Sequence, residues 1–322
     1  MKITPNMIDK ELRLKGKFLK PFTNYKSKKN FEINNKLINL LYKNNKSKKM
    51  ICDKVYITKR DGNKVRACIY RPLNQKSNAV GLLWLHGGGY GMCIPEQDIT
   101  YYENFMKVEN CIIVAPDYTH SVDSPYPSAF NDCYEVLYWM KQNVNKLGIK
   151  DNQLFVGGES AGGGLTAALS LYARDKKEVN IAFQMPLYPM IDDRMITNSS
   201  QYDVPIWNSK SNYLGWKLYL GNLFKSDNVP KYAAPSREIN YLNLPPTFTF
   251  VGDIDPFYDE TIEYINNLKK AGVKTSLFVY KGCYHGFDTV CPNATKSRHA
   301  TNELLKAFRY ACDNYFYEQP KI

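Results

Sequence analysis

The sequence lacks the features of a membrane-spanning or disulfide-bonded secreted protein. No stretch of the 322-residue chain approaches the run of about eighteen apolar residues that a transmembrane helix requires. The start of the chain also lacks the apolar middle section of a secretory signal peptide. The eight cysteines are scattered without CxxC spacing, which favours buried free thiols over disulfides or zinc ligands. We therefore predict a cytoplasmic protein with no stable membrane insertion and no bound metal.

Acidic residues are scarce at the start of the chain, and this scarcity decides how the net charge of +12 is interpreted. Residues 1–50 hold fourteen Lys or Arg against three acidic residues, so this segment carries +11 and the rest of the chain only +1. Because the body is nearly neutral, we predict no nucleic-acid partner. The lysines are interspersed with asparagines, as a Lys- and Asn-rich proteome would supply. Contact of this segment with a membrane surface or a polyanion stays open as the alternative.

Short apolar runs that alternate with helical stretches predict an α/β fold. The turn Asp61-Gly62 lies between two alternating segments, 54–58 and 64–70, which is the signal of a β-hairpin. Six apolar runs follow, each suited to a strand buried on both faces of a parallel sheet: residues 80–85, 111–115, 153–157, 181–187, 247–252 and 275–280. Together they predict about eight mostly parallel strands flanked by helices.

Two segments depart from this alternation and are predicted to form a helical cap. Residues 1–50 contain apolar residues at helical spacing between lysine-rich connections. Residues 190–235 are irregular and rich in aromatic residues, so we interpret them as an insertion that packs beside the first segment. The main domain then spans residues 51–322, with the insertion inside it.

The sharpest motif is a GxSxG sequence at Gly158–Gly162, placed between a predicted strand and a helix rich in small residues. A strained strand-to-helix turn lifts the hydroxyl of Ser160 off the sheet, and glycines two residues away on either side avoid steric overlap. The amide of Ala161 then points at the reaction centre and can donate to a developing oxyanion. The alternative is a glycine-rich helix start that binds phosphate or only packs closely.

A second glycine motif, His86-Gly87-Gly88-Gly89, follows the predicted strand 80–85. Three successive glycines leave backbone amides free to converge on one oxygen, as the stabilisation of a tetrahedral intermediate requires. We predict Gly87 and Gly88 as oxyanion donors, with a flexible turn as the alternative. A dinucleotide-binding loop is excluded because neither glycine-rich stretch fits GxGxxG, and no cofactor is predicted.

A nucleophilic serine needs a general base and an orienting carboxylate, and the chain has only four histidines. His285 is the natural base, because it lies in a loop directly after the last predicted strand, at the carboxyl edge of the sheet. Asp253, Asp255 and Asp259 follow the preceding strand. Asp255 is the best candidate for the acid, Asp253 is the alternative, and Asp259 is expected to cap the next helix.

These motifs together resemble the hormone-sensitive-lipase-like family of α/β-hydrolases, close to bacterial acetyl esterases and short-chain carboxylesterases. The resemblance covers about residues 80–287, in which the following motifs occur in family order: HGGGY (86–90), DY and PYP (117–127), GESAGG (158–163), YP (188–189), DPxxDE (255–260) and HGF (285–287). The order of nucleophile, acid and base is also typical of α/β-hydrolases. The resemblance implies an α/β-hydrolase fold, an oxyanion hole from Gly87, Gly88 and Ala161, a helical cap and no cofactor.

The sequence departs from the family pattern at two places. Glu159 occupies a position where the family usually has aspartate, and residues 119–123 replace a usual Arg-Leu-Ala-Pro-Glu stretch. Such residues normally brace the site. The substitutions therefore bear on efficiency and substrate range rather than on the type of reaction.

The predicted function is a serine carboxylesterase that hydrolyses small, short-chain acyl esters through Ser160, His285 and Asp255. The same triad would also serve a peptidase or amidase, or a lipase at a membrane surface. A ligand-binding module without catalysis is the alternative from another class. The predicted substrate pocket contains Tyr90, Tyr188 and Trp207, for which structural packing is an equal alternative. A homo-oligomer is possible, but no sequence feature identifies an interface.

Overall fold

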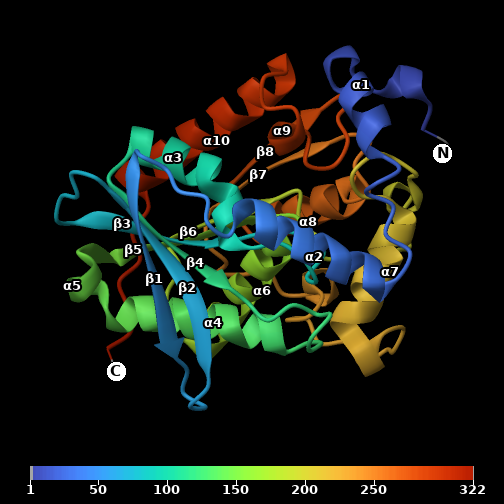
Figure 1. Cartoon of the computed structure of the whole chain (residues 1–322). Coiled ribbons are helices and arrows are strands. Elements are labelled where there is room, and N and C mark those ends of the chain that lie inside the picture. Colours follow the sequence, from blue (N-terminus) through green and yellow to red (C-terminus); the bar gives the residue numbers. More distant parts are fainter. Residues whose placement is uncertain (1–2, 322) are drawn as a thin grey trace.

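The computed structural model describes residues 3–321. Residues 1–2 of the predicted N-terminal segment and residue 322 of the predicted main domain lie outside the described part. Its centre is one eight-stranded sheet with the order β1-β2-β4-β3-β5-β6-β7-β8 (Figure 1). The first two strands form an antiparallel hairpin, β2 pairs antiparallel with β4, and all other neighbours are parallel. The strands are β1 (Met50–Thr58), β2 (Lys64–Pro72), β3 (Ala79–Leu85), β4 (Cys111–Asp117), β5 (Ile149–Glu159), β6 (Phe183–Leu187), β7 (Thr247–Gly252) and β8 (Thr275–Tyr280). The predicted α/β fold with eight mostly parallel strands is confirmed.

Helices cover both faces of the sheet, which is why the central strands are apolar on both sides. In β3, Leu83 and Leu85 pack in the core cluster shared with α4 and α6, whereas Leu82 and Trp84 pack in the cluster shared with α3 and α10. The described helices are α1 (Lys10–Leu19), α2 (Lys28–Tyr42), α3 (Ile99–Val108), α4 (Ser128–Gln142), α5 (Val144–Leu147), α6 (Ala161–Lys176), α7 (Ser209–Leu220), α8 (Tyr258–Lys270), α9 (Phe287–Val290) and α10 (Thr295–Asn314). Short 3₁₀ turns lie at Pro5–Met7, Pro95–Asp98, Ser199–Gln201, Gly221–Leu223 and Pro235–Arg237. Across residues 3–321, no helix is long and apolar enough to span a bilayer.

The segment from Tyr25 into α2 and the insertion that contains α7 meet over the glycine loop after β3. The ring of Tyr25 lies 5.9 Å from that of Trp207, and the Phe31 ring lies 6.3 Å from it. A Cβ atom added to Gly89 would overlap the Trp207 ring, and one added to Gly91 would lie 2.7 Å from Phe31. Glycine is therefore required where the loop passes beneath these aromatic side chains.

Candidate active site

Ser160, His285 and Asp255 come from three different strand ends and meet in one chain of hydrogen bonds. The Ser160 Oγ lies 2.8 Å from His285 Nε2, and His285 Nδ1 lies 2.8 Å from Asp255 Oδ2. Because a carboxylate only accepts, Nδ1–H donates to Asp255, and Nε2 is left to accept the serine proton. All three side chains are buried, with Ser160 3% exposed and His285 5% exposed.

The turn that carries Ser160 is strained, as a strand-to-helix elbow requires. Ser160 lies at the end of β5 with φ 58° and ψ −118°, a conformation that non-glycine residues rarely adopt. Gly158 and Gly162 pass so close to the carbonyl oxygen of Leu85 that a Cβ atom at either position would overlap it. The two glycines therefore allow the serine turn to pack directly against the end of β3.

Only one of the three aspartates that follow β7 contacts the imidazole. Asp255 Oδ2 faces His285, while its Oδ1 accepts a hydrogen bond from the Phe257 amide at 2.9 Å. Asp253 Oδ1 instead accepts from the amide of Gly282 at 2.6 Å, which fixes the loop that leads to His285. The expected capping of a helix by Asp259 is wrong, because its carboxylate accepts from the Ser199 amide in the insertion.

The backbone amides of the glycine loop that are free to donate to an oxyanion are only partly the ones that were predicted. The Gly87 amide donates to Glu159 Oε1 at 2.6 Å, so it is already used and the predicted role of Gly87 as an oxyanion donor is wrong. Gly88 and Gly89 have φ values of 102° and 58°, and within residues 3–321 their amides contact no hydrogen-bond acceptor. Ala161 is the first residue of α6, where amides have no partner inside the helix.

Glu159 is a positioning residue, at a place where the resemblance indicated a bracing side chain but not the group that it contacts. Burial and the nearby carboxylate of Asp98 raise its pKa well above the usual range, with Asp288 adding to this and the Gly87 amide opposing it. The carboxyl group ties the residue before the nucleophile to the glycine loop. Its place beside Ser160 at the end of β5 was the available signal, but the partner lies 72 positions away in the sequence.

The three predicted pocket residues have different surroundings. Tyr90 is 1% exposed, donates from its hydroxyl to the Met190 carbonyl at 2.7 Å and stacks on Tyr219 with ring centroids 3.8 Å apart. These contacts give Tyr90 a packing role. The Tyr188 ring lies 5.1 Å from the His285 ring, and Trp207 lies against the glycine loop. Both remain candidates for the wall of the site.

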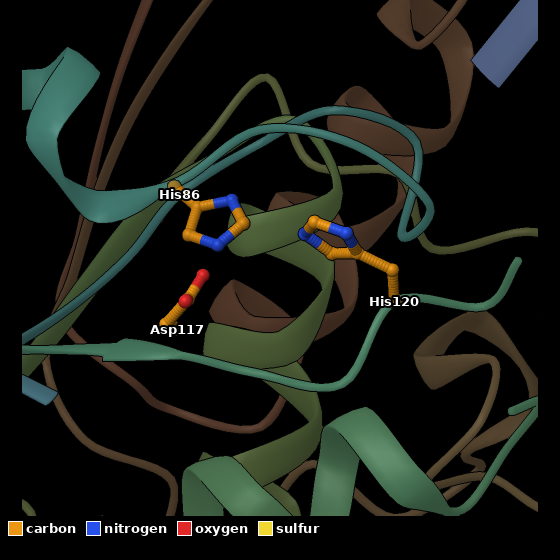
Figure 2. A group of neighbouring side chains, drawn as sticks. All are labelled: His86, Asp117 and His120. Carbon is orange, nitrogen blue, oxygen red and sulfur yellow. The ribbon is translucent and has the colours of Figure 1, made fainter. Parts of the chain in front are cut away.

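A group of possible metal ligands lies behind the glycine loop, where Figure 2 shows His86, Asp117 and His120 around a common space. One ligand atom from each lies within 4.8 Å of the others. His120 Nε2 lies 2.8 Å from the Cys93 carbonyl oxygen, and Asp117 Oδ2 accepts from Arg66. Burial and then His120 lower the pKa of His86 to about 3, and its Nε2 has no partner among the described residues. Because a zinc site needs three or four uncommitted ligand atoms, these contacts favour bracing of the loop.

Comparisons with known proteins give the same fold. A family model described as an alpha/beta hydrolase fold matches residues 82–289. The esterase LipI of Mycobacterium tuberculosis is 30% identical over 240 residues, which cover 73% of either chain. An ethyl acetate hydrolase of Pseudomonas putida is 26% identical over 72% of this chain and 74% of that protein. Among solved structures, a bacterial heroin esterase has a TM-score of 0.90 and 31% identity, and the match covers 96% of this chain and 99% of that one.

Proposed function

Because the chain belongs to the α/β-hydrolase fold family, we propose that it is a serine carboxylesterase that acts on small, short-chain acyl esters. The observation that carries the proposal is the unbroken contact from Ser160 through His285 to Asp255. Relatives named as esterases and as an ethyl acetate hydrolase support an ester rather than an amide as the substrate. The retained serine and histidine argue against a ligand-binding module without catalysis.

In the proposed mechanism, Ser160 Oγ attacks the ester carbonyl while its proton passes to His285 Nε2. Asp255 stabilises the imidazolium that forms and holds the ring in the productive orientation. His285 then gives the proton to the leaving alcohol, which yields an acyl-enzyme on Ser160. A water molecule, deprotonated by the same nitrogen, then attacks the acyl carbon. The bond from the acyl carbon to Ser160 Oγ breaks, His285 returns the proton to Ser160 Oγ, and the acid is released.

The oxyanion is proposed to bind the amides of Gly88, Gly89 and Ala161 rather than that of Gly87. Amides without internal partners are free to donate to charge that develops in the transition state. Glu159 supports this arrangement, because its contact with Gly87 fixes the start of the loop.

We expect Glu159→Ala to lower kcat about 10- to 100-fold with little change in KM. The replacement leaves the Gly87 amide without its acceptor, and an unmade buried hydrogen bond costs about 1–3 kcal/mol. Glu159→Gln retains an oxygen acceptor and should stay within a few-fold of the wild type. Steady-state kinetics on a short-chain ester separate the two variants. Equal damage by glutamine and alanine would show that the carboxylate itself is needed.

We propose a preference for short acyl chains because aromatic side chains cover the site and leave little room for a long one. Ser160 is 3% exposed, and Trp207, with Tyr25 and Phe31 behind it, lies over the glycine loop. We propose that residues 1–50 and the insertion 190–235 act together as a helical cap that limits the space for the acyl group.

The test of the proposed function is hydrolysis of p-nitrophenyl esters from acetate to palmitate, with Ser160→Ala measured at matched concentration. We expect activity on the acetate and butyrate esters, a decline of at least about tenfold by the longest chain, and no activity in the variant. A p-nitroanilide in the same assay addresses the amidase alternative. A folded wild type that hydrolyses no ester and does not react with a fluorophosphonate probe would refute the proposal.

A further inference from the structure

Helix α2 is amphipathic, and only Phe31, near its start, is a buried apolar residue. Polar side chains make most of the other contacts between α2 and the protein. Asn35 Nδ2 donates to the Gly91 carbonyl at 2.8 Å, and its Oδ1 accepts from the Cys93 amide at 3.1 Å. Asn34 Nδ2 donates to the Tyr25 hydroxyl at 2.6 Å. Beyond the buried Phe31, the inward face of α2 is therefore held by hydrogen bonds to Tyr25 and to the loop that follows the glycine motif.

The opposite face of α2 presents large apolar side chains to solvent. Four of these side chains have the sequence spacing that places them on one side of a helix. The members of this apolar face are Ile33, Leu37, Leu40 and Leu41, which are 54%, 50%, 82% and 62% exposed. Figure 1 shows α2 lying across the outside of the molecule. A cluster of this kind on one exposed helix marks an interaction surface rather than ordinary scattered exposure.

The charge around this apolar face is strongly positive. Residues 26–49 contain eight lysines and one acidic residue, Glu32. Glu32 lies 3.9 Å from Lys28, and Lys49 pairs with Glu103 at 2.6 Å. Within residues 3–321 the other lysines of this segment have no carboxylate within 4 Å: Lys26, Lys29, Lys36, Lys43, Lys46 and Lys48. These charges remain free to meet a negatively charged partner.

We propose that α2 docks the protein peripherally on an anionic lipid bilayer. Exposed leucines flanked by lysines are the combination that an interfacial helix uses, since the apolar side chains enter the acyl boundary and the lysines meet headgroups. A second copy of the chain fits less well, because a two-fold interface would set each lysine-rich face against its own copy. In this orientation, only α2 would separate the loop after the glycine motif from the bilayer. This inference does not depend on the catalytic proposal.

The test is co-sedimentation of the full chain with vesicles of phosphatidylcholine alone or with 30 mol% phosphatidylglycerol, a composition chosen as roughly that of an anionic leaflet. The wild type should bind the anionic vesicles, and binding should fall at least about tenfold when salt is raised toward 0.5 M, because screening weakens the lysine contacts. Leu40→Gln/Leu41→Gln should lower binding at least about tenfold, since two exposed leucines no longer enter the bilayer. Ile239→Gln is the matched control, as Ile239 is 96% exposed but lies far from α2 in the sequence, between the insertion and β7.

Three results would overturn the proposal. They are the absence of binding to anionic vesicles, equal binding to neutral vesicles, and binding that the leucine variant leaves unchanged. A concentration-dependent dimer that the same variant abolishes, without vesicle binding, would assign the face to a second copy. The far-UV circular dichroism spectrum of the leucine variant should match that of the wild type, which shows that the variant is folded. A wild type that hydrolyses no ester would contradict the catalytic proposal and leave the proposal of lipid docking unaffected.

Discussion

Ser160→Ala is expected to lower kcat for a short-chain ester by on the order of 10⁶-fold, and His285→Gln by a similar factor. The variant that carries both changes should be about as inactive as either one. Serine and imidazole act as one unit across their 2.8 Å contact, so the loss of either removes the activated nucleophile. The measurement is single-turnover or steady-state hydrolysis of p-nitrophenyl acetate, corrected for the uncatalysed rate.

Two matched controls accompany these variants. His299→Gln removes a half-exposed histidine that contacts the Tyr280 hydroxyl, and it should leave kcat within a few-fold of the wild type.

Asp255→Asn should lower kcat by about 10⁴-fold, because the imidazole loses the partner that sets its tautomer. Asp253→Asn should lower it much less, since Asp253 contacts the backbone of Gly282 instead. Losses that multiply in the double variant would contradict a single Ser-His unit.

The strands and the three residues of the proposed triad could be predicted because their signals are local. Each apolar run ends at the carboxyl edge of the sheet, so the residues that follow β5, β7 and β8 are brought to one place by topology alone. The order Ser160, Asp255, His285 then identified the partners without any knowledge of side-chain positions.

The donors in the glycine loop could not be predicted in the same way. Three successive glycines have similar local chemistry, and the sequence does not show which amide is occupied. The contact between Gly87 and Glu159 depends on how β3 lies beside β5. A non-local contact therefore decided which of the glycines could serve as a donor.

Helix α2 shows a second limit of sequence patterns. Its apolar spacing predicted a helix, and an apolar face normally predicts the side that packs inward. The structure reverses this for Leu37, Leu40 and Leu41, because Asn34 and Asn35 satisfy backbone and hydroxyl groups beneath the helix. Periodicity defines the two faces of a helix but does not by itself assign one to the core.

Asp98→Asn is expected to stabilise the protein at pH 8 and to have little effect near pH 4. Asp98 is buried, and burial raises its pKa to about 7 from a usual value of 3.8, with Asp288 adding to the shift and the Trp84 indole opposing it. A group with a raised folded-state pKa contributes full stability below its unfolded pKa and loses that contribution as the pH rises through the folded value. Wild-type stability should therefore fall between about pH 4 and pH 7 by up to about 4 kcal/mol from this group.

The asparagine variant lacks this titration but keeps an oxygen that can accept from the Trp84 indole, which lies 2.9 Å from Asp98 Oδ2. Its Tm should exceed that of the wild type by a margin that grows from pH 4.5 to pH 8, measured by differential scanning fluorimetry. Asp151→Asn, at an exposed position, is the control and should show no such trend. Glu159 and Asp288, whose pKa values are also raised by burial, share the same interior region, and removal of one charge should ease the ionisation of both. A variant that is less stable than the wild type by the same amount at every pH would show that the hydrogen bond to Trp84, rather than the buried charge, determines the contribution of Asp98.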